Sequence, residues 1–199
     1  MHNVEIDKAR AVIYNLLSLL FVEDFAKNKT SDIVNLLEIL ASNPFNEVVE
    51  TASKNILEHI KTKGEASIYE EYQELFLIPF GEFVSLSISL YHEQREGGIM
   101  QLKVKDILAK TTIRRDEKGF TAQEDHFGFV FTLSSYLISQ RVDNKLDEDL
   151  QKELFIEVLQ PYLSKLFFRL MATKSEIYSQ VALILESFYN FEIGYLDLN

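Results

Sequence analysis

Apolar residues recur at intervals of three and four along most of the chain, which is the period of an α-helix with one buried face. In the first such segment Leu16, Leu17 and Leu20 fall on one face. Only seven glycines and three prolines interrupt the 199 residues, so the helices are joined by short turns. The pattern predicts an all-α fold, a single-domain helical bundle of about eight to ten helices.

Capping signals divide the first part of this pattern into separate helices. Ser31, with Asp32 in the next position, predicts the start of a second helix. Asn43 followed by Pro44 predicts the N-cap and first residue of a third, and Gly64 predicts its end.

Similar signals divide the rest of the chain. Ser67 and Glu70 have the spacing of a capping box, and the helix they open is expected to end before Pro79. The later part carries the remaining signals, which are helical periodicity over 100–113 and 123–141, a polar run over Val142–Glu148, two helices flanking Pro161, and a last helix beginning at Ser175.

One segment has a different period. Its apolar residues alternate with serines, in the order Val84, Ser85, Leu86, Ser87, Ile88, Ser89 and Leu90. A period of two is typical of a strand, but a lone strand leaves its backbone groups unpaired. We therefore expect residues 80–92 to form an extended connector laid over the helices.

Composition narrows the function. A hydrophobic content of 47% with fifteen phenylalanines is enough for one core, so residues 1–199 are expected to form one domain. The 31 acidic and 20 basic residues give a net charge of −11, which disfavours nucleic acid as a partner. The absence of cysteine excludes thiol chemistry and favours a cytoplasmic location. The apolar stretch Ala11–Phe21 is too short for membrane insertion.

Signatures of catalysis are missing from the sequence. Histidines at positions 2, 59, 92 and 126 form no zinc-binding array, and neither glycine-rich phosphate loops nor a G-x-S-x-G nucleophile motif occurs. We therefore expect no enzyme activity, no metal and no cofactor.

One cluster of polar residues, Gln123, Glu124, Asp125 and His126, stands at the start of an aromatic-rich helix. In a structural interpretation, Glu124 or Asp125 caps the helix and His126 makes a hydrogen bond below it. In a functional interpretation, Asp125 and His126 are exposed anchors for a bound peptide, which is compatible with the first. Metal ligation by the pair would need further ligands, and the sequence nominates none.

Three blocks in order carry a family resemblance. They are Tyr72-Gln73-Glu74-Leu75-Phe76-Leu77-Ile78-Pro79, then Ser89-Leu90-Tyr91 ahead of Gly97-Gly98, then Asp125-His126 at the start of a helix. Over roughly residues 68–190 the chain resembles the TorD, DmsD and NarJ family of redox-enzyme maturation chaperones. It departs from the family's E-P-x-D-H motif at Ala122-Gln123.

The resemblance implies a TorD-like cytoplasmic chaperone. Its partners would be the twin-arginine signal peptide and the body of a molybdoenzyme catalytic subunit, whose apo form it holds while the cofactor is inserted and export is delayed. Such a signal peptide has a basic segment and an apolar segment, and an acidic receptor suits the first of these.

We hypothesise that the connector and the Asp125 helix line one groove. In it Phe76, Tyr91 and Phe129 would meet the apolar part of the peptide, and Glu124 and Asp125 its arginines. For the three aromatic residues the alternative is simple core packing. The predicted peptide-binding residues are Tyr72, Leu75, Phe76, Ser89, Tyr91, Gln123, Glu124, Asp125, His126 and Phe129.

Two other functions stay open at this point. One is an all-helical metal-dependent phosphohydrolase with Asp125 and His126 as ligands, although that class has histidine before aspartate. The other is a non-catalytic helical adaptor or ligand-binding domain. The sequence leaves open whether the chain is a monomer or a helix-swapped dimer, and whether it binds a nucleotide or a cofactor precursor.

Overall fold

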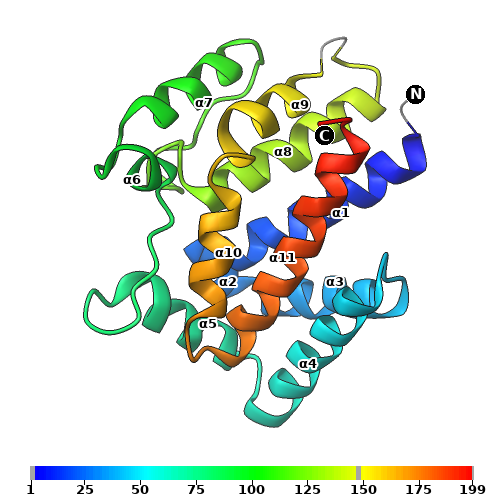
Figure 1. Ribbon diagram of the computed structural model, residues 1–199, viewed down its shortest axis with the longest axis vertical. Helices are drawn as coiled ribbons and strands as arrows, with labels where there is room; N and C mark the ends of the chain where they lie inside the picture. Colours follow the sequence, from blue (N-terminus) through cyan, green and yellow to red (C-terminus); the bar gives the residue numbers. More distant parts are fainter. Residues whose placement is uncertain (1–2, 147–148, 199) are drawn as a thin grey trace. The chain divides into compact units, whose positions relative to one another are not determined.

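The computed structural model describes residues 3–146 and 149–198. All regular elements among these residues are helices, without a strand, which confirms the all-α prediction. Their elements in order are α1 (Val4–Phe21), α2 (Glu23–Asn28), α3 (Thr30–Ser42), α4 (Glu47–Lys63), α5 (Ala66–Tyr72), the π-helical turn η1 (Gln73–Leu77), α6 (Ile88–Glu93), α7 (Ile99–Ala109), α8 (Phe127–Val142), α9 (Leu150–Leu154), the π-helical turn η2 (Phe155–Leu159), α10 (Leu163–Met171) and α11 (Glu176–Tyr195) (Figure 1). No described helix is long and apolar enough to cross a membrane.

Contacts within the chain form two compact units. The first unit comprises Met1–Ser18 and Leu86–Tyr162, and the second comprises Leu19–Ser85 and Leu163–Asn199. The prediction of one domain over residues 1–199 stays a prediction.

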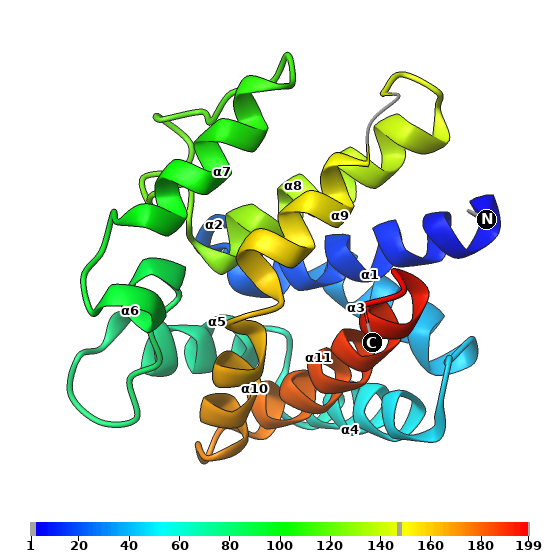
Figure 2. The ribbon, with the colours of Figure 1, turned by 45° about the horizontal axis from the view of Figure 1, so that its top comes forward.

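In the first unit, a buried polar network joins α1 to α9. Arg10 donates from Nη1 to the Asp7 carboxylate at 2.6 Å and from Nη2 to the Gln151 side-chain oxygen at 2.5 Å. The Gln151 amide then donates to the Tyr14 hydroxyl at 3.2 Å. Burying the arginine is tolerated because its charge is paired and hydrogen-bonded. Figure 2 shows α8 and α9, which pack side by side in this unit.

In the second unit, α11 packs between α4 and α10 (Figure 1). The core is aromatic, and the rings of Phe76 and Tyr178 meet edge to face with their centroids 4.9 Å apart. Buried hydroxyls find backbone acceptors, because Tyr178 donates to the Leu20 carbonyl at 2.8 Å and Tyr72 to the Phe21 carbonyl at 3.4 Å. Such pairing is what buried tyrosines require.

Two predicted helix boundaries are confirmed. Gly64 ends α4 in a conformation with φ of +90°, which a side chain would strain. Ser175 is the N-cap of α11, and its hydroxyl oxygen accepts a hydrogen bond from the Tyr178 N–H at 2.8 Å.

Other boundaries differ from the prediction. The N-cap of α4 is Asn46, not Asn43, which instead ends α3 and donates its amide to the Ile39 carbonyl at 3.2 Å. Ser31 lies inside α3, which begins one residue earlier. Ser67 lies inside α5 and donates to the Gly64 carbonyl, so it forms no capping box. The polar run Val142–Glu148 separates α8 from α9, and residues 147–148 lie outside the described part of the chain.

The predicted extended connector over 80–92 is only partly correct. Residues 83–86 form no regular element, Ser87 is extended, and Ser87 and His126 form a single antiparallel bridge. From Ile88 the chain turns into α6, because the carbonyl and carboxylate of Asp125 bind the N–H groups of Ile88 and Ser89 at 2.9 Å and 2.8 Å. Acceptors on a residue distant in sequence therefore start a helix in a segment whose local period indicates a strand.

We predict that Gly64→Ala lowers the free energy of unfolding by about 1 kcal/mol, because alanine is strained at positive φ. Gly194→Ala is the matched control, since Gly194 lies inside α11 with open space around the position of a Cβ atom. There alanine should stabilise by up to about 1 kcal/mol. Urea unfolding measures both, and equal effects of the two substitutions would contradict the prediction.

Candidate functional site

Asp125 is the centre of the hydrogen bonds in the predicted site. Its side chain is completely buried, and one carboxylate oxygen accepts from the Ser87 hydroxyl at 2.9 Å and the Ser89 N–H at 2.8 Å. The Asp125 carbonyl accepts from the Ile88 N–H, so the carboxylate and the carbonyl together pair two N–H groups at the start of α6.

The same hydrogen bonds link the motifs that the sequence resemblance rests on. Ser89, fixed by Asp125, accepts at Oγ from the Gly98 N–H at 3.1 Å. A Cβ atom on Gly98 would lie 1.6 Å from the Glu93 carboxylate, so a larger residue there would force the Glu93 side chain to move. The serine, glycine and aspartate motifs thus form one continuous structure of the first unit.

His126 is the N-cap of α8. Its Nδ1 accepts a hydrogen bond from the Gly128 N–H at 3.1 Å, which requires an unprotonated nitrogen. Burial lowers the pKa of His126 to about 4, although the neighbouring Asp125 charge acts in the opposite direction. The imidazole is therefore neutral at physiological pH.

Glu124 is buried and is already paired. Its carboxylate lies 3.2 Å from Arg115 Nε and accepts from the Gln101 amide at 2.7 Å, with Lys105 at 3.6 Å. Burial acts to raise the pKa of Glu124, but the hydrogen bond from Gln101 and the two cations outweigh it, so the pKa lies below its ordinary value. Glu124 thus ties the segment before α8 to α7.

These contacts correct the expectation of exposed acidic anchors. Asp125 and Glu124 are buried, and their carboxylates bind groups of the protein itself. The cap of α8 is His126, not Glu124 or Asp125.

Three other predicted residues of this unit reach the surface. Gln123 is exposed, and Tyr91 and Phe129 are partly exposed. The two aromatic rings each pack against a phenylalanine. The ring centroids of Tyr91 and Phe127 are 5.9 Å apart, and those of Phe129 and Phe120 are 5.5 Å apart.

The remaining predicted residues, Tyr72, Leu75 and Phe76, belong to the second unit. All three are buried, and core packing is the interpretation that fits Phe76 and Tyr72. Among the described residues no group of three or more histidine, aspartate or glutamate side chains is placed to hold a metal ion.

An anchored loop follows these residues. Pro79 follows the π-helical turn η1, and the Leu75 carbonyl accepts from the Val84 N–H at 2.8 Å. Glu82 fastens the same loop to the start of α11 by accepting from the Lys174 N–H at 2.6 Å. Between these fixed points Phe80 is 87% exposed.

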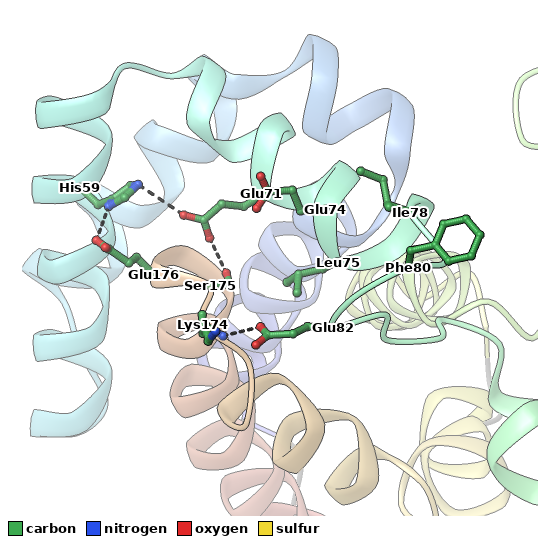
Figure 3. A pocket seen from close by; sticks show the side chains of 10 residues that line it. All are labelled: His59, Glu71, Glu74, Leu75, Ile78, Phe80, Glu82, Lys174, Ser175 and Glu176. Atoms are coloured by element: carbon green, nitrogen blue, oxygen red, sulfur yellow. Dashed lines mark hydrogen bonds and ion pairs between the residues drawn. The ribbon is translucent and has the colours of Figure 1, made fainter.

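Beside the loop lies a cavity of about 470 Å³, which we name the acidic groove (Figure 3). Its lining combines carboxylates with apolar side chains and is formed by His59, Glu71, Glu74, Leu75, Ile78, Phe80, Glu82, Lys174, Ser175 and Glu176. Of these, only Leu75 is a predicted site residue. Phe80 and Glu82 had no sequence signal beyond their place after the Pro79 motif.

Glu71 organises the far wall of the acidic groove. One carboxylate oxygen accepts from the Ser175 hydroxyl and, at 2.9 Å, from the Ile177 N–H, and the other lies 3.3 Å from His59 Nε2. On its other side His59 Nδ1 is 2.9 Å from Glu176 (Figure 3). The contacts hold α4, α5 and α11 together around the groove.

Comparison with models of known protein families identifies the family of this chain. A model described as nitrate reductase delta subunit matches residues 42–167, which is more than half of the chain. The chain belongs to this family. Its members are molybdoenzyme maturation chaperones and not catalytic enzymes. The match confirms the resemblance to the TorD, DmsD and NarJ family. No curated protein matched the chain.

The match to the nitrate reductase delta subunit family includes all three motif blocks, but it ends before Ser175. In this member of the family the Asp125-His126 motif fastens the segment before α6 to the start of α8. A binding role for the motif stays a prediction.

We predict that Asp125→Ala lowers the free energy of unfolding by about 2–4 kcal/mol, because it removes the acceptor of the buried Ser89 N–H and of the partly buried Ser87 hydroxyl. Asp125→Asn keeps one acceptor oxygen and should lose less. Asp106→Ala, on the exposed face of α7, is the control and should change stability by less than about 0.5 kcal/mol. Similar effects at positions 125 and 106, measured by urea unfolding, would refute this role.

His126 makes stability depend on pH. Its folded pKa of about 4 lies below the ordinary 6.5, so the unfolded chain binds the proton more readily, and stability falls as pH drops from 6.5 to 4. His126→Asn keeps a neutral capping oxygen and should remove up to about 3 kcal/mol of this fall. Unfolding of both proteins from pH 7 to 4 measures the difference, and parallel pH profiles would contradict the assignment.

Proposed function

We propose that the protein is a cytoplasmic chaperone for a molybdenum-cofactor oxidoreductase. It binds the twin-arginine signal peptide and the apo form of the catalytic subunit, aids cofactor insertion, and delays export until insertion is complete. The observation that carries the proposal is membership of the nitrate reductase delta subunit family over residues 42–167. In this role the chain binds and performs no catalysis.

The charge of the chain supports a basic partner. A net charge of −11 attracts the positively charged start of a signal peptide and steers its approach. The apolar segment that follows needs apolar surface, and exposed phenylalanine and isoleucine side chains beside carboxylates supply that combination in the second unit.

The predicted site residues divide into two roles in this proposal. Gln123, Tyr91 and Phe129 offer accessible surface to the peptide in the first unit. Ser89, Glu124, Asp125 and His126 hold that surface in place, and Tyr72, Leu75 and Phe76 support the loop after η1 in the second unit.

The proposal predicts binding of a signal peptide by the purified protein. Isothermal titration should use synthetic twin-arginine signal peptides from the molybdoenzymes of the same organism. We expect one of them to bind with a Kd of about 1 μM or tighter, corresponding to about 8 kcal/mol. Replacing both arginines with glutamine should weaken binding several-fold, since charge complementarity is lost.

The control is a peptide of the same composition in which charged residues from its start are exchanged with residues of the apolar segment, so that neither segment is continuous. Failure of every authentic peptide to bind would refute signal-peptide recognition. Light scattering of the complex would also distinguish a monomer from a helix-swapped dimer.

A further inference from the structure

We infer that the acidic groove binds the junction of the signal peptide, with an arginine against its carboxylates and the adjoining apolar residue against Phe80. This assignment rests on the proposed function and gives it a location in the second unit.

Phe80 is an exposed aromatic side chain on a loop that is held in place. A phenylalanine side chain exposed to 87% costs hydrophobic free energy, and Ile78 beside it is 43% exposed. The loop that presents them is held at both ends, by the Val84 hydrogen bond to Leu75 and the Lys174 hydrogen bond to Glu82. An apolar side chain fixed in solvent in this way marks an interaction surface.

The acidic groove beside Phe80 has the size of a ligand pocket. A volume of about 470 Å³ is within the range of about 300–1,000 Å³ typical of ligand pockets. Leu75, Ile78 and Phe80 supply its apolar side, and the loop side and the α11 side belong to the same unit. Figure 3 shows the carboxylates and Phe80 around the same opening.

The charge of the acidic groove suits a cationic group. Four carboxylates line the groove, Glu71, Glu74, Glu82 and Glu176, against one lysine and one histidine. Glu71 and Glu82 are engaged in holding α11, whereas Glu74 is exposed on η1 beside the apolar side chains. A guanidinium group, with its fork of N–H donors, is the cation best suited to bind several carboxylates while it stacks on an aromatic ring.

The occupant that combines these features is a peptide segment in which arginine precedes an apolar residue. A short cationic metabolite would leave Phe80 and Ile78 exposed, and a purely apolar helix would leave the carboxylates buried without partners. The junction between the basic and apolar segments of a signal peptide has both parts in the required order.

The test titrates the full-length protein and four variants with the signal peptide that binds best. Phe80→Ala should weaken binding about tenfold through lost apolar contact, and Glu74→Lys about three- to tenfold through charge repulsion. Two matched controls in the same unit should stay within about twofold of the unmodified protein, namely Phe168→Ala on the exposed face of α10 and Glu38→Lys on α3.

A second peptide, with both arginines replaced by glutamine, separates the two parts of the groove. With it, Glu74→Lys should have no further effect, while Phe80→Ala should weaken binding as before. Circular dichroism melting of each variant confirms that the fold is retained.

The outcomes are distinguishable. If the unmodified protein binds no twin-arginine peptide, the proposed function fails and this assignment with it. If it binds, but Phe80→Ala and Glu74→Lys behave like their controls, the function stands and the acidic groove is not the site.

Discussion

Helix ends leave backbone N–H and C=O groups that need hydrogen-bond partners, and at several ends in this protein residues distant in sequence supply them. The carboxylate of Asp125 closes the start of α6, and Glu71 closes the start of α11 from 104 residues away. After η1, the Leu75 carbonyl accepts from the Val84 N–H, which lies further along the chain. These hydrogen bonds fix the loops and short helices between the longer helices, and so fix the surfaces that those loops present.

This constraint explains why the motif residues are buried. Asp125, Ser89 and Gly98 form a chain of hydrogen bonds inside the first unit, so replacing Asp125 or Ser89 leaves a buried N–H without its acceptor. Their hydrogen bonds hold the start of α6, the helix that carries Tyr91. The residue types of this motif therefore reflect the hydrogen bonds of the buried scaffold more directly than they reflect the exposed surface.

In the second unit, too, some residues of the acidic groove hold the framework and others form its accessible surface. Glu71 and Glu82 hold α11 and the loop in place, and Phe80 and Glu74 face outward from the framework that they create. A surface that must accept a basic and an apolar segment together benefits from such pre-organisation, because little conformational entropy remains to be lost on binding.

The sequence by itself determined the helical class, since apolar periodicity is local, and it determined the ends at Gly64 and Ser175, since both caps act within one helical turn. Order and spacing of motifs were also enough for the family. Only the tertiary structure decided that Asp125 is buried, that residues 88–93 are helical despite their alternating pattern, and that residues 71–82 meet 174–176 in one groove. In each case the deciding partner is far away in the chain, and local patterns carry no information about such partners.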